Sequence, residues 1–350
     1  IKTKNSRKLL SEGATKFYTS KPLNLVAVTG TNGKSSVADF YFQILKLNNK
    51  KVASIGTLGV KTHLNNLKVN NTTLDPISLN KHLQKIKKYK IENVILEASS
   101  HGLKQNRLDG LNFKTGIFTN LSRDHLDYHK SYKDYLNSKL LLFKNLLKKN
   151  SNIITDINIP QYKIIKNIAK RKKQKIYTIE STKSSLELTK HNYKNDKQVF
   201  QIKYNNKIYL LSVNLIGKVQ IKNILMAMIA AEKSGLKFDK IVKAIKKIKN
   251  VNGRFEKIGK LKNNSTVILD YAHSPDALKN CLQNIKDQFS DKKISIVFGC
   301  GGDRDKNKRS QMGKIANKFC QKIYLTDDNP RYENPKKIRM DIKKSINKNK

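Results

Sequence analysis

The chain has 350 residues, enough for two or three domains of about 100–200 residues each. It contains 72 Lys and Arg against 26 Asp and Glu, a formal net charge of +46, and 38% of its residues are hydrophobic. This composition excludes collagen-like, coiled-coil and low-complexity classes, and no apolar run approaches the roughly 18 residues that a membrane span needs. Three cysteines do not make a disulfide framework and no secretory signal is recognisable, so we expect a cytoplasmic protein.

The positive charge is spread along the whole chain. Only nine of the 72 cationic residues are arginine. Clustered cations interleaved with aromatic residues would indicate a nucleic-acid surface, and the sequence has no such stripe. We therefore interpret lysine as a general surface residue and expect no nucleic-acid partner. The alternative from a different class is a basic protein that binds nucleic acid. An arginine in such a chain suggests a contact that needs the planar guanidinium group.

The predicted elements of the first half alternate between strand and helix. Residues 1–22 are polar and predict a helical lead-in, and the apolar strand Leu25–Val28 runs through Thr29–Ser36 into an apolar-periodic helix at 37–45. Further strands are predicted at 51–55, 93–97 and 115–119, with a helix at 78–90. This alternation predicts an α/β fold, a mostly parallel sheet with helices on both faces.

The second half contains two further patterns. From about 151 to 215 we predict short β-rich pieces, at 175–179, 199–202 and 207–213, and then helices at 219–234 and 238–248. After Asn252-Gly253 a second α/β alternation predicts strands at 266–270, 293–298 and 322–326, helices at 275–288 and 310–319, and a basic helical stretch at 341–350. We therefore predict a first domain over 1–250, with 1–22 as its lead-in, and a partial Rossmann-like α/β domain over 251–350.

The segment between the first strand and the first long helix has the composition of a phosphate-binding loop. Its glycines let backbone N–H groups approach phosphates at a helix N-terminus, Lys34 can reach the β/γ-phosphates, and Ser35 can bind Mg²⁺. The standard loop has glycine five residues before Gly33, where this chain has Val28, so the loop is a variant. The predicted phosphate-binding residues are Thr29, Gly30, Thr31, Asn32, Gly33, Lys34, Ser35 and Ser36.

Polar side chains also follow two other predicted strands. Glu97 ends the strand at 93–97, which is the position expected for a second Mg²⁺ ligand, although the serines after it could simply cap a helix. The segment 118–129 contains two histidines and two aspartates after the strand at 115–119. Ligands bind at the carboxyl edge of such sheets, so we assign a metal or phosphate role to His125 and treat His129 as structural.

Seven motifs follow one another along the chain: GTNGKSS, EASSHGLKQNR, TNLSRDHLDYH, NGRFE, DYAHSPD, FGCGGDRD and DNPR. Together they resemble the Mur ligases, the ATP-dependent amide-bond-forming enzymes of peptidoglycan synthesis. The resemblance covers about residues 20–340, and its order and spacing are most similar to the members that make the tripeptide.

The resemblance implies ATP and Mg²⁺ as cofactors and an acyl-phosphate intermediate on the D-glutamate of UDP-N-acetylmuramoyl-L-alanyl-D-glutamate. It implies that 1–250 is the central ATP-binding domain and that Lys139 is a carbamylated lysine near the metals. The implied catalytic residues are Lys34, Glu97, His125 and Lys139, and the implied metal ligands are Ser35, Glu97, His125 and Lys139.

The resemblance also implies the binding residues. Thr72, Thr73, Ser99, Gln105 and Arg107 match positions that hold the muramoyl dipeptide. Asn223, Arg254, Asp270 and His273 match positions that hold the nucleotide. The chain departs from the family at Val219-Gln220, where many relatives have His-Asn.

The DNPR segment implies the choice of amino acid. Family members that add meso-diaminopimelate have arginine at its last position, here Arg331, where a guanidinium group can hold the distal carboxylate that L-lysine lacks. The other residues implied for this subsite are Arg304, Asp328, Asn329 and Pro330. We expect meso-diaminopimelate as substrate; ligation of L-lysine, and a folylpolyglutamate synthase-like ligase, are the alternatives.

The resemblance further implies parts outside this chain. Residues 1–22 are too short for the family's uridine-binding domain, and the family's Gly-Lys-Gly-His-Glu segment would follow residue 350. We expect a monomer with no membrane partner.

Overall fold

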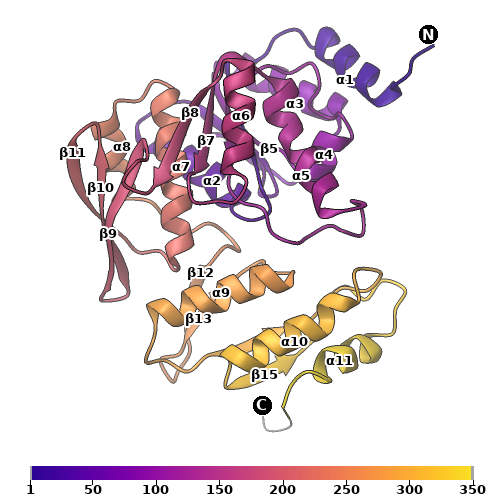
Figure 1. The fold of residues 1–350 in the computed structure, drawn as a ribbon, viewed down its shortest axis with the longest axis vertical. Helices are drawn as coiled ribbons and strands as arrows, with labels where there is room; N and C mark the ends of the chain where they lie inside the picture. The colour runs from indigo at the N-terminus through magenta and orange to yellow at the C-terminus, as the bar shows by residue number, and fades with distance from the viewer. Residues whose placement is uncertain (1, 348–350) are drawn as a thin grey trace. The chain divides into compact units, whose positions relative to one another are not determined.

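The computed structural model describes residues 2–347, which fold into two compact units. The first unit contains the chain up to residue 121 together with 133–214 and 220–252. The second contains 122–132, 215–219 and the chain from 253 onward. Figure 1 shows the course of the chain, and we describe each unit by itself. Within 2–347, no helix is long and apolar enough to cross a bilayer.

The first unit is built on an eleven-stranded sheet, ordered β11-β10-β9-β8-β7-β6-β1-β5-β2-β3-β4. Strand β1 (Asn24–Thr29) lies between β5 (Asn93–Glu97) and β6 (Phe113–Phe118) and is parallel to both. The remaining strands are β2 (Val52–Gly56), β3 (Gly59–Lys61), β4 (Asn66–Leu67), β7 (Leu147–Asp156), β8 (Lys175–Glu180), β9 (Leu186–Lys194), β10 (Lys197–Tyr204) and β11 (Lys207–Val213). The predicted α/β class is confirmed.

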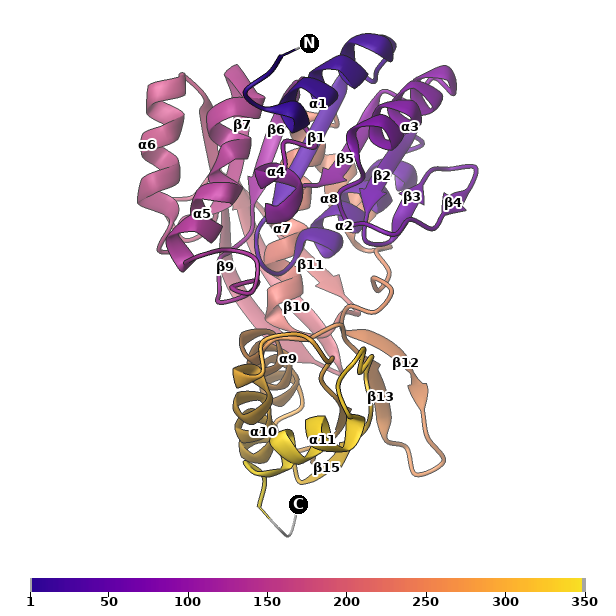
Figure 2. The same ribbon diagram turned by 90° about the vertical axis from the view of Figure 1, so that its right-hand side faces the viewer.

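Helices cover both faces of this sheet (Figure 2). Leu25 and Ala27 of β1 face one side and pack with α3 (Pro76–Lys88) and α6 (Tyr162–Lys172), whereas Val26 and Val28 alternate to the other. That other side is covered by α2 (Lys34–Leu47), α7 (Lys218–Lys233) and α8 (Phe238–Ile245). The first unit also contains α1 (Ser6–Phe17), α4 (Ser100–Lys104), α5 (Tyr132–Leu141) and the π-helical turn η1 (Leu142–Leu146).

Local sequence explains the burial of α2 and the start of α3. In α2, every residue from Ser35 to Phe42 is buried, and so are Ile44 and Leu45, so the first three turns of the helix are enclosed on all sides. In α3, the Asp75 carboxylate accepts hydrogen bonds from the backbone N–H groups of Ile77 and Ser78, and Pro76 occupies the first helical position.

The three short strands predicted between 151 and 215 are present as β8, β10 and β11, but the predicted start of this pattern is wrong. The parallel alternation continues beyond 151: β7 pairs in parallel with β6, α6 follows, and β8 pairs in parallel with β7. The missed signal is the set Ile165, Ile168 and Ala169, which is buried at helical spacing. Strand β9 was not predicted because most of its side chains are partly or fully exposed.

The second unit contains two small sheets and three helices. Strands β12 (Glu256–Lys260) and β13 (Thr266–Leu269) are antiparallel, and β14 (Ser295–Phe298) and β15 (Lys322–Leu325) are parallel. The helices are α9 (Pro275–Gln288), α10 (Asn307–Phe319) and α11 (Pro335–Lys343). Its core joins Leu278, Met312 and Ile342 from the three helices.

The predicted terminal helix is displaced in the structure. Helix α11 ends at Lys343, not beyond it, and it begins at Pro335, where the Asn334 side chain accepts hydrogen bonds from the N–H groups of Lys336 and Lys337. The prediction followed the basic residues and overlooked this N-cap. Residues 348–350 lie outside the described residues.

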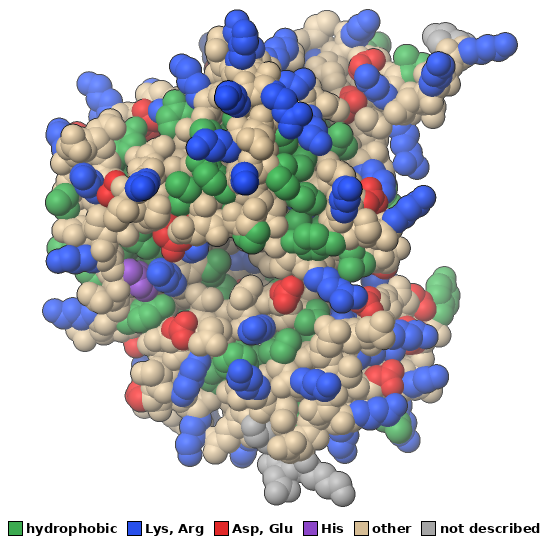
Figure 3. Space-filling model, viewed as in Figure 1, with side chains coloured by type: hydrophobic (Ala, Val, Ile, Leu, Met, Phe, Trp, Pro, Cys, Tyr) green, Lys and Arg blue, Asp and Glu red, His purple; other side chains and the backbone are tan. Residues whose placement is uncertain are grey.

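Lysine and arginine side chains are scattered over the face of the molecule seen in Figure 3. They do not gather there into one continuous stripe.

Candidate active site

The loop between β1 and α2 is held by close backbone packing. Gly33 has φ 89°, and a Cβ atom there would lie 2.6 Å from Oδ1 of Asn223 on α7. Gly30 has φ 145°, and a Cβ atom there would collide with the hydroxyl of Thr119, just after β6. Glycine is therefore required at both positions, and the loop fits between the end of β6 and α7.

Two residues that follow β6 fix the loop from the side. The Thr119 hydroxyl donates to the Asn32 carbonyl (2.6 Å), and the Asn120 side chain accepts from the Asn32 N–H (3.0 Å). The Thr31 N–H donates to the Asn120 carbonyl (3.0 Å). The sequence analysis assigned no role to Thr119 or Asn120, although their position at a strand end beside β1 was a usable signal.

Lys34 begins α2 and folds back over this loop. Its Nζ donates to the carbonyl oxygens of Gly30 (2.9 Å) and Thr31 (2.8 Å). The N-terminus of an α-helix attracts anions, because free backbone N–H groups and the helix dipole meet there. The ammonium group thus lies where phosphate oxygens can be bound.

Ser35 and Glu97 meet beneath the loop. The Ser35 hydroxyl donates to Oε2 of Glu97 at 3.0 Å, and both residues are buried. The other carboxylate oxygen, Oε1, accepts the N–H of Thr57 at 2.8 Å. A Cβ atom at Gly56 would collide with this carboxylate, so β2 leaves room for it only because residue 56 is glycine.

This oxygen donor set fits Mg²⁺. Hydroxyl and carboxylate oxygens are hard ligands, and Mg²⁺ is commonly bound by one or two protein oxygens together with phosphates and water. Within residues 2–347, no cluster of three or more His, Cys, Asp or Glu side chains has metal-binding geometry. The hydroxyl of Ser35 and the carboxylate of Glu97 suit a Mg²⁺ ion whose other ligands are phosphate and water.

Lys139 on α5 also reaches the phosphate-binding loop. Its side chain is 1% exposed, and Nζ donates to the Gly30 carbonyl at 2.7 Å. The ammonium lies 4.3 Å from the Tyr135 ring centroid, and the Tyr135 hydroxyl is 3.1 Å from Oγ1 of Thr31. A lysine on a helix is usually a surface residue, but α5 places this one in the interior.

The residues predicted for the dipeptide cluster next to Glu97. Thr73 Oγ1 donates to the Glu97 carbonyl (2.8 Å) and lies 3.0 Å from Ser99 Oγ. Arg107 donates to the Thr73 carbonyl (2.6 Å) and, through Nε and Nη2, to Gln105 (2.9 and 2.7 Å). The Thr72 hydroxyl lies 3.0 Å from that of Thr57. The structure brings all five predicted residues together.

Ser99 also caps a helix, as the simpler interpretation predicted. It precedes α4, and its hydroxyl accepts the N–H of Gly102 at 3.0 Å. Ser99 can therefore cap α4 and still belong to the cluster predicted for the dipeptide.

Asn223 belongs to a buried polar pair on α7. Its Nδ2 donates to Oε1 of Gln220 at 2.9 Å. Gln220 is one of the two positions where the chain departs from its family, and its side chain contacts the predicted nucleotide residue. The residue before Asn223, Lys222, pairs with Asp156 (2.9 Å) and Glu180 (2.5 Å), which end β7 and β8.

Of the predicted residues in the second unit, His125 and His273 share a neighbour. Their Nε2 atoms lie 3.6 and 3.9 Å from Oδ2 of Asp124. His125 has φ 52°, a left-handed backbone, and its carbonyl accepts the N–H of His129, which is buried. The sequence analysis gave Asp124 no role of its own.

Arg254 and Asp270 lie on either side of the β12–β13 hairpin. The Arg254 guanidinium is 4.5 Å from the Tyr271 ring centroid. The Asp270 carboxylate accepts the N–H groups of Phe255 (2.8 Å) and Ala272 (3.0 Å). Burial raises the pKa of Asp270, against the lowering effect of these hydrogen bonds and of Arg254.

The residues predicted for the amino acid occupy two loops of the second unit, one after β14 and one after β15. Arg331 has φ 49° and donates from Nη1 to the Gly302 carbonyl at 2.7 Å. Arg304 pairs with Asp127 at 3.3 Å. The Asn329 side chain accepts the Arg331 N–H (3.1 Å), while Asp328 is exposed and the Pro330 carbonyl approaches Gly302.

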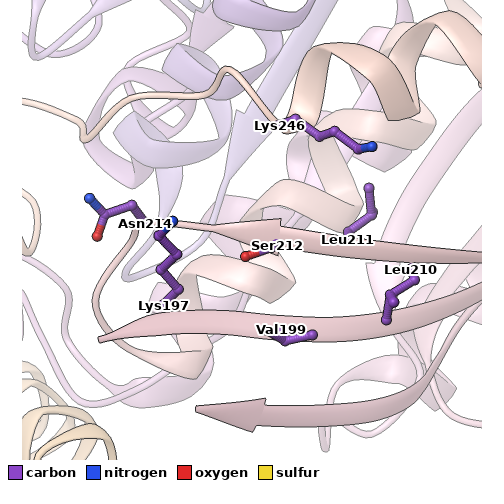
Figure 4. Close-up of a pocket in the computed structure, with 7 residues that line it drawn as sticks. All are labelled: Lys197, Val199, Leu210, Leu211, Ser212, Asn214 and Lys246. Atoms are coloured by element: carbon purple, nitrogen blue, oxygen red, sulfur yellow. The ribbon is translucent and has the colours of Figure 1, made fainter. Parts of the chain in front are cut away.

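A pocket of about 430 Å³ lies away from these residues, at the antiparallel edge of the first unit's sheet (Figure 4). It contains none of the predicted site residues. Its lining is formed by Lys197, Val199, Leu210, Leu211, Ser212, Asn214 and Lys246.

Family models match most of the chain. The Mur ligase middle domain matches residues 28–231, and the Mur ligase glutamate ligase domain matches residues 253–349. The UDP-N-acetylmuramoyl-L-alanyl-D-glutamate--2,6-diaminopimelate ligase of Rickettsia rickettsii is 41% identical over 353 residues, which cover 99% of this chain and 73% of the relative. The ligase of the same name from Chelativorans sp. is 38% identical, over 99% of this chain and 71% of the relative.

Solved structures agree in fold. A structure of a UDP-N-acetylmuramoyl-L-alanyl-D-glutamate--2,6-diaminopimelate ligase has a TM-score of 0.72 and 31% identity, over 97% of this chain and 70% of that one. Folylpolyglutamate synthase of Mycobacterium tuberculosis, complexed with ADP, has a TM-score of 0.80 but only 14% identity, over 97% and 82% of the two chains. The second similarity concerns the fold alone.

Proposed function

The chain belongs to the Mur ligase family, and on that premise we propose that it joins meso-2,6-diaminopimelate to UDP-N-acetylmuramoyl-L-alanyl-D-glutamate at the expense of ATP. The reaction is an amide-bond ligation of peptidoglycan synthesis. It proceeds by phosphorylation of the D-glutamate γ-carboxylate, and the amine of the incoming amino acid then displaces phosphate. Relatives of this name that cover 99% of the chain support the choice of substrates.

The observation that supports this function best is the Ser35–Glu97 pair beneath the phosphate-binding loop. Its hydroxyl and carboxylate are 3.0 Å apart, and both are adjacent to the helix N-terminus where Lys34 begins α2. Ser35 and Glu97 would hold Mg²⁺, which, when bound, supplies positive charge against the transferring phosphoryl group. The backbone N–H groups of the loop and the Lys34 ammonium bind and orient the nucleotide phosphates.

Lys139 has a separate role in this proposal. As a free amine it donates to the Gly30 carbonyl, and carbamylation would convert it into an anion beside the same loop. We assign the carbamylated form to the active enzyme, as an anion beside a bound metal, and His125 keeps the metal role that the resemblance gives it.

The cluster around Thr73 is suited to the acceptor substrate. It lies at the end of β5, next to Glu97, and it contains hydroxyl donors and one guanidinium group. These groups bind carboxylate and phosphate oxygens. Thr72, Thr73, Ser99, Gln105 and Arg107 therefore orient the dipeptide so that its γ-carboxylate faces the nucleotide.

Arg331 and Arg304 select the amino acid. A guanidinium group can hold the distal carboxylate of meso-diaminopimelate through two parallel hydrogen bonds, whereas the L-lysine side chain ends in an ammonium group of like charge. Asn329 supports the turn in which Arg331 lies.

The proposal includes the enzyme's setting. The described cysteines, Cys281, Cys300 and Cys320, are free and buried, which suits a reducing compartment. We propose a cytoplasmic monomer.

Phosphate release coupled to product identification tests this function. The enzyme is given ATP, Mg²⁺ and UDP-N-acetylmuramoyl-L-alanyl-D-glutamate, together with meso-diaminopimelate or L-lysine in separate reactions. A further reaction replaces the nucleotide substrate with a folate and supplies L-glutamate. We expect tripeptide with meso-diaminopimelate only. Equal turnover with L-lysine would contradict the amino-acid assignment, and turnover of a folate with L-glutamate would contradict the whole proposal.

A further inference from the structure

Arg309 is a buried arginine that the proposed function does not use. It lies on α10, and its side chain is 1% exposed. One terminal nitrogen, Nη2, donates to Oε1 of Glu333 at 2.8 Å, and the other, Nη1, donates to Oδ2 of Asp341 at 3.2 Å. The guanidinium group therefore joins two carboxylates that belong to different parts of the second unit.

The two carboxylates have different surroundings. Asp341 is a residue of α11, so its pair with Arg309 ties one helix to another. Glu333 lies in the loop after β15, two residues beyond Arg331. Its Oε1 also accepts the N–H of Asp303, at 2.7 Å, in the loop after β14. Arg309 thus reaches both arginine-containing loops through Glu333.

The two loops also bind each other directly. The Asp303 carboxylate accepts the N–H of Tyr332 at 3.2 Å, and the Gly302 N–H donates to the Asn329 carbonyl at 2.9 Å. A Cβ atom at Gly302 would collide with the Pro330 carbonyl, so the two backbones are in contact. Asp303 has φ 49°, a left-handed backbone conformation in which Asp is one of the more common L residues.

We propose that Arg309, acting through Glu333, is a positioning residue that locks these two loops together and thereby sets the affinity for the incoming amino acid. Arg304 is the residue after Asp303, and the Arg331 side chain donates to the Gly302 carbonyl. Both guanidinium groups would therefore move with any shift of the two loop backbones. The inference deepens the proposed function, and it depends on that function for the identity of the amino acid.

If Arg309 only stabilised the second unit, loss of either of its two ion pairs would have the same effect. Asp341 therefore provides the matched control. Asp341→Asn weakens the contact of Arg309 with α11 and leaves Glu333 and Asp303 untouched. Glu333→Gln keeps the size of the side chain and an oxygen for the Asp303 N–H, but it removes the charge that Arg309 needs. Arg309→Lys keeps the charge and removes the second donor.

The experiment compares these three variants in the complete enzyme. It measures kcat and the KM values for meso-diaminopimelate and for ATP, together with amide hydrogen exchange in segments 300–305 and 329–333. We expect Glu333→Gln and Arg309→Lys to raise the KM for meso-diaminopimelate about tenfold, since a charge-assisted contact is lost, and to leave the KM for ATP within about twofold. Exchange should accelerate in both segments. Asp341→Asn should lower the melting temperature and leave both KM values unchanged.

Three results would overturn the inference. The first is an unchanged KM for meso-diaminopimelate in a folded Glu333→Gln variant. The second is an equal rise of both KM values, which would indicate general destabilisation. The third is the same KM effect in Asp341→Asn. If the wild-type enzyme does not use meso-diaminopimelate, the proposed function fails by itself, and the exchange of the two segments still decides whether Arg309 and Glu333 lock the loops.

Discussion

The Ser35 hydroxyl donates to the Glu97 carboxylate at 3.0 Å, which links the first turn of α2 to the end of β5. Because the pair lies beneath the phosphate-binding loop, the charge of Glu97 should matter for the metal rather than for packing. Because glutamine has nearly the same shape as glutamate, we expect Glu97→Gln to fold. Its kcat should fall by about 100-fold or more, and half-maximal activity should need a higher Mg²⁺ concentration. Glu187→Gln, on β9, is the control. Unchanged Mg²⁺ dependence in Glu97→Gln would remove Glu97 from the metal site.

Lys34→Ala should abolish acyl-phosphate formation. The side chain lies over the loop and contributes two hydrogen bonds to carbonyl oxygens, so its loss should leave the fold near-native. The measurement is ATP consumption in the presence of the nucleotide substrate, with circular dichroism as a check on folding. Lys46→Ala, an exposed residue of the same helix, should consume ATP normally. Normal consumption by Lys34→Ala would contradict its role.

Lys139→Ala should be nearly inactive, and formate should restore part of the activity. A carbamylated lysine supplies two oxygens, and a small carboxylate can replace them in the space that the truncated side chain leaves. Activity is measured with and without formate, alongside Lys133→Ala, an exposed residue of the same helix. Full activity of Lys139→Ala without any carboxylate would remove this lysine from the mechanism.

Arg331→Ala should lower activity with meso-diaminopimelate far more than the trace activity with L-lysine. Leaving a charged group without its partner costs roughly 2–4 kcal/mol, which corresponds to about 30- to 1000-fold in discrimination. The values of kcat/KM for both amino acids in wild type and variant provide the test. Lys337→Ala, an exposed residue of α11, serves as control. Equal losses for the two amino acids would mean that Arg331 does not contact the distal carboxylate.

Glu333 makes the second unit sensitive to acid. Hydrogen bonds from the Arg309 guanidinium and the Asp303 N–H lower the pKa of Glu333 to about 2. A carboxylate with a lowered folded-state pKa stabilises the protein above its unfolded pKa of about 4.3, and this contribution is lost as the pH falls toward 2. The urea midpoint of wild type, followed from pH 5 to pH 2, should fall more steeply than that of Glu333→Gln. Parallel curves would contradict the assignment.

The sequence predicts where many of the candidate site residues lie, because its motifs follow strand ends. The loop Thr29–Ser36, Glu97 and the Thr73 cluster occupy one edge of the sheet, as parallel strands require. Contacts between distant segments were not predictable in the same way. Nothing local marks Asn120 as a partner of the loop, or Glu333 as the bridge between Arg309 and Asp303.

The weakest sequence predictions concern elements whose periodicity is faint. Most side chains of strand β9 are partly or fully exposed, and its alternation of apolar and polar residues ends after Leu188. Lys139 shows the opposite problem, because a lysine on a helix is usually a surface residue and only the tertiary structure shows its burial.

The contacts of the arginines have a consequence for engineering this protein. In a chain with nine arginines among 72 cations, Arg107, Arg254, Arg304, Arg309 and Arg331 all contact a carbonyl, a carboxylate or an aromatic ring. Arg107 and Arg309 each donate through more than one nitrogen and Arg254 lies over an aromatic ring, contacts for which an ammonium is a poor replacement, and Arg304 and Arg331 belong to the proposed amino-acid subsite. Surface redesign for solubility or crystallisation can therefore draw on the exposed lysines, and it should leave these five positions as they are.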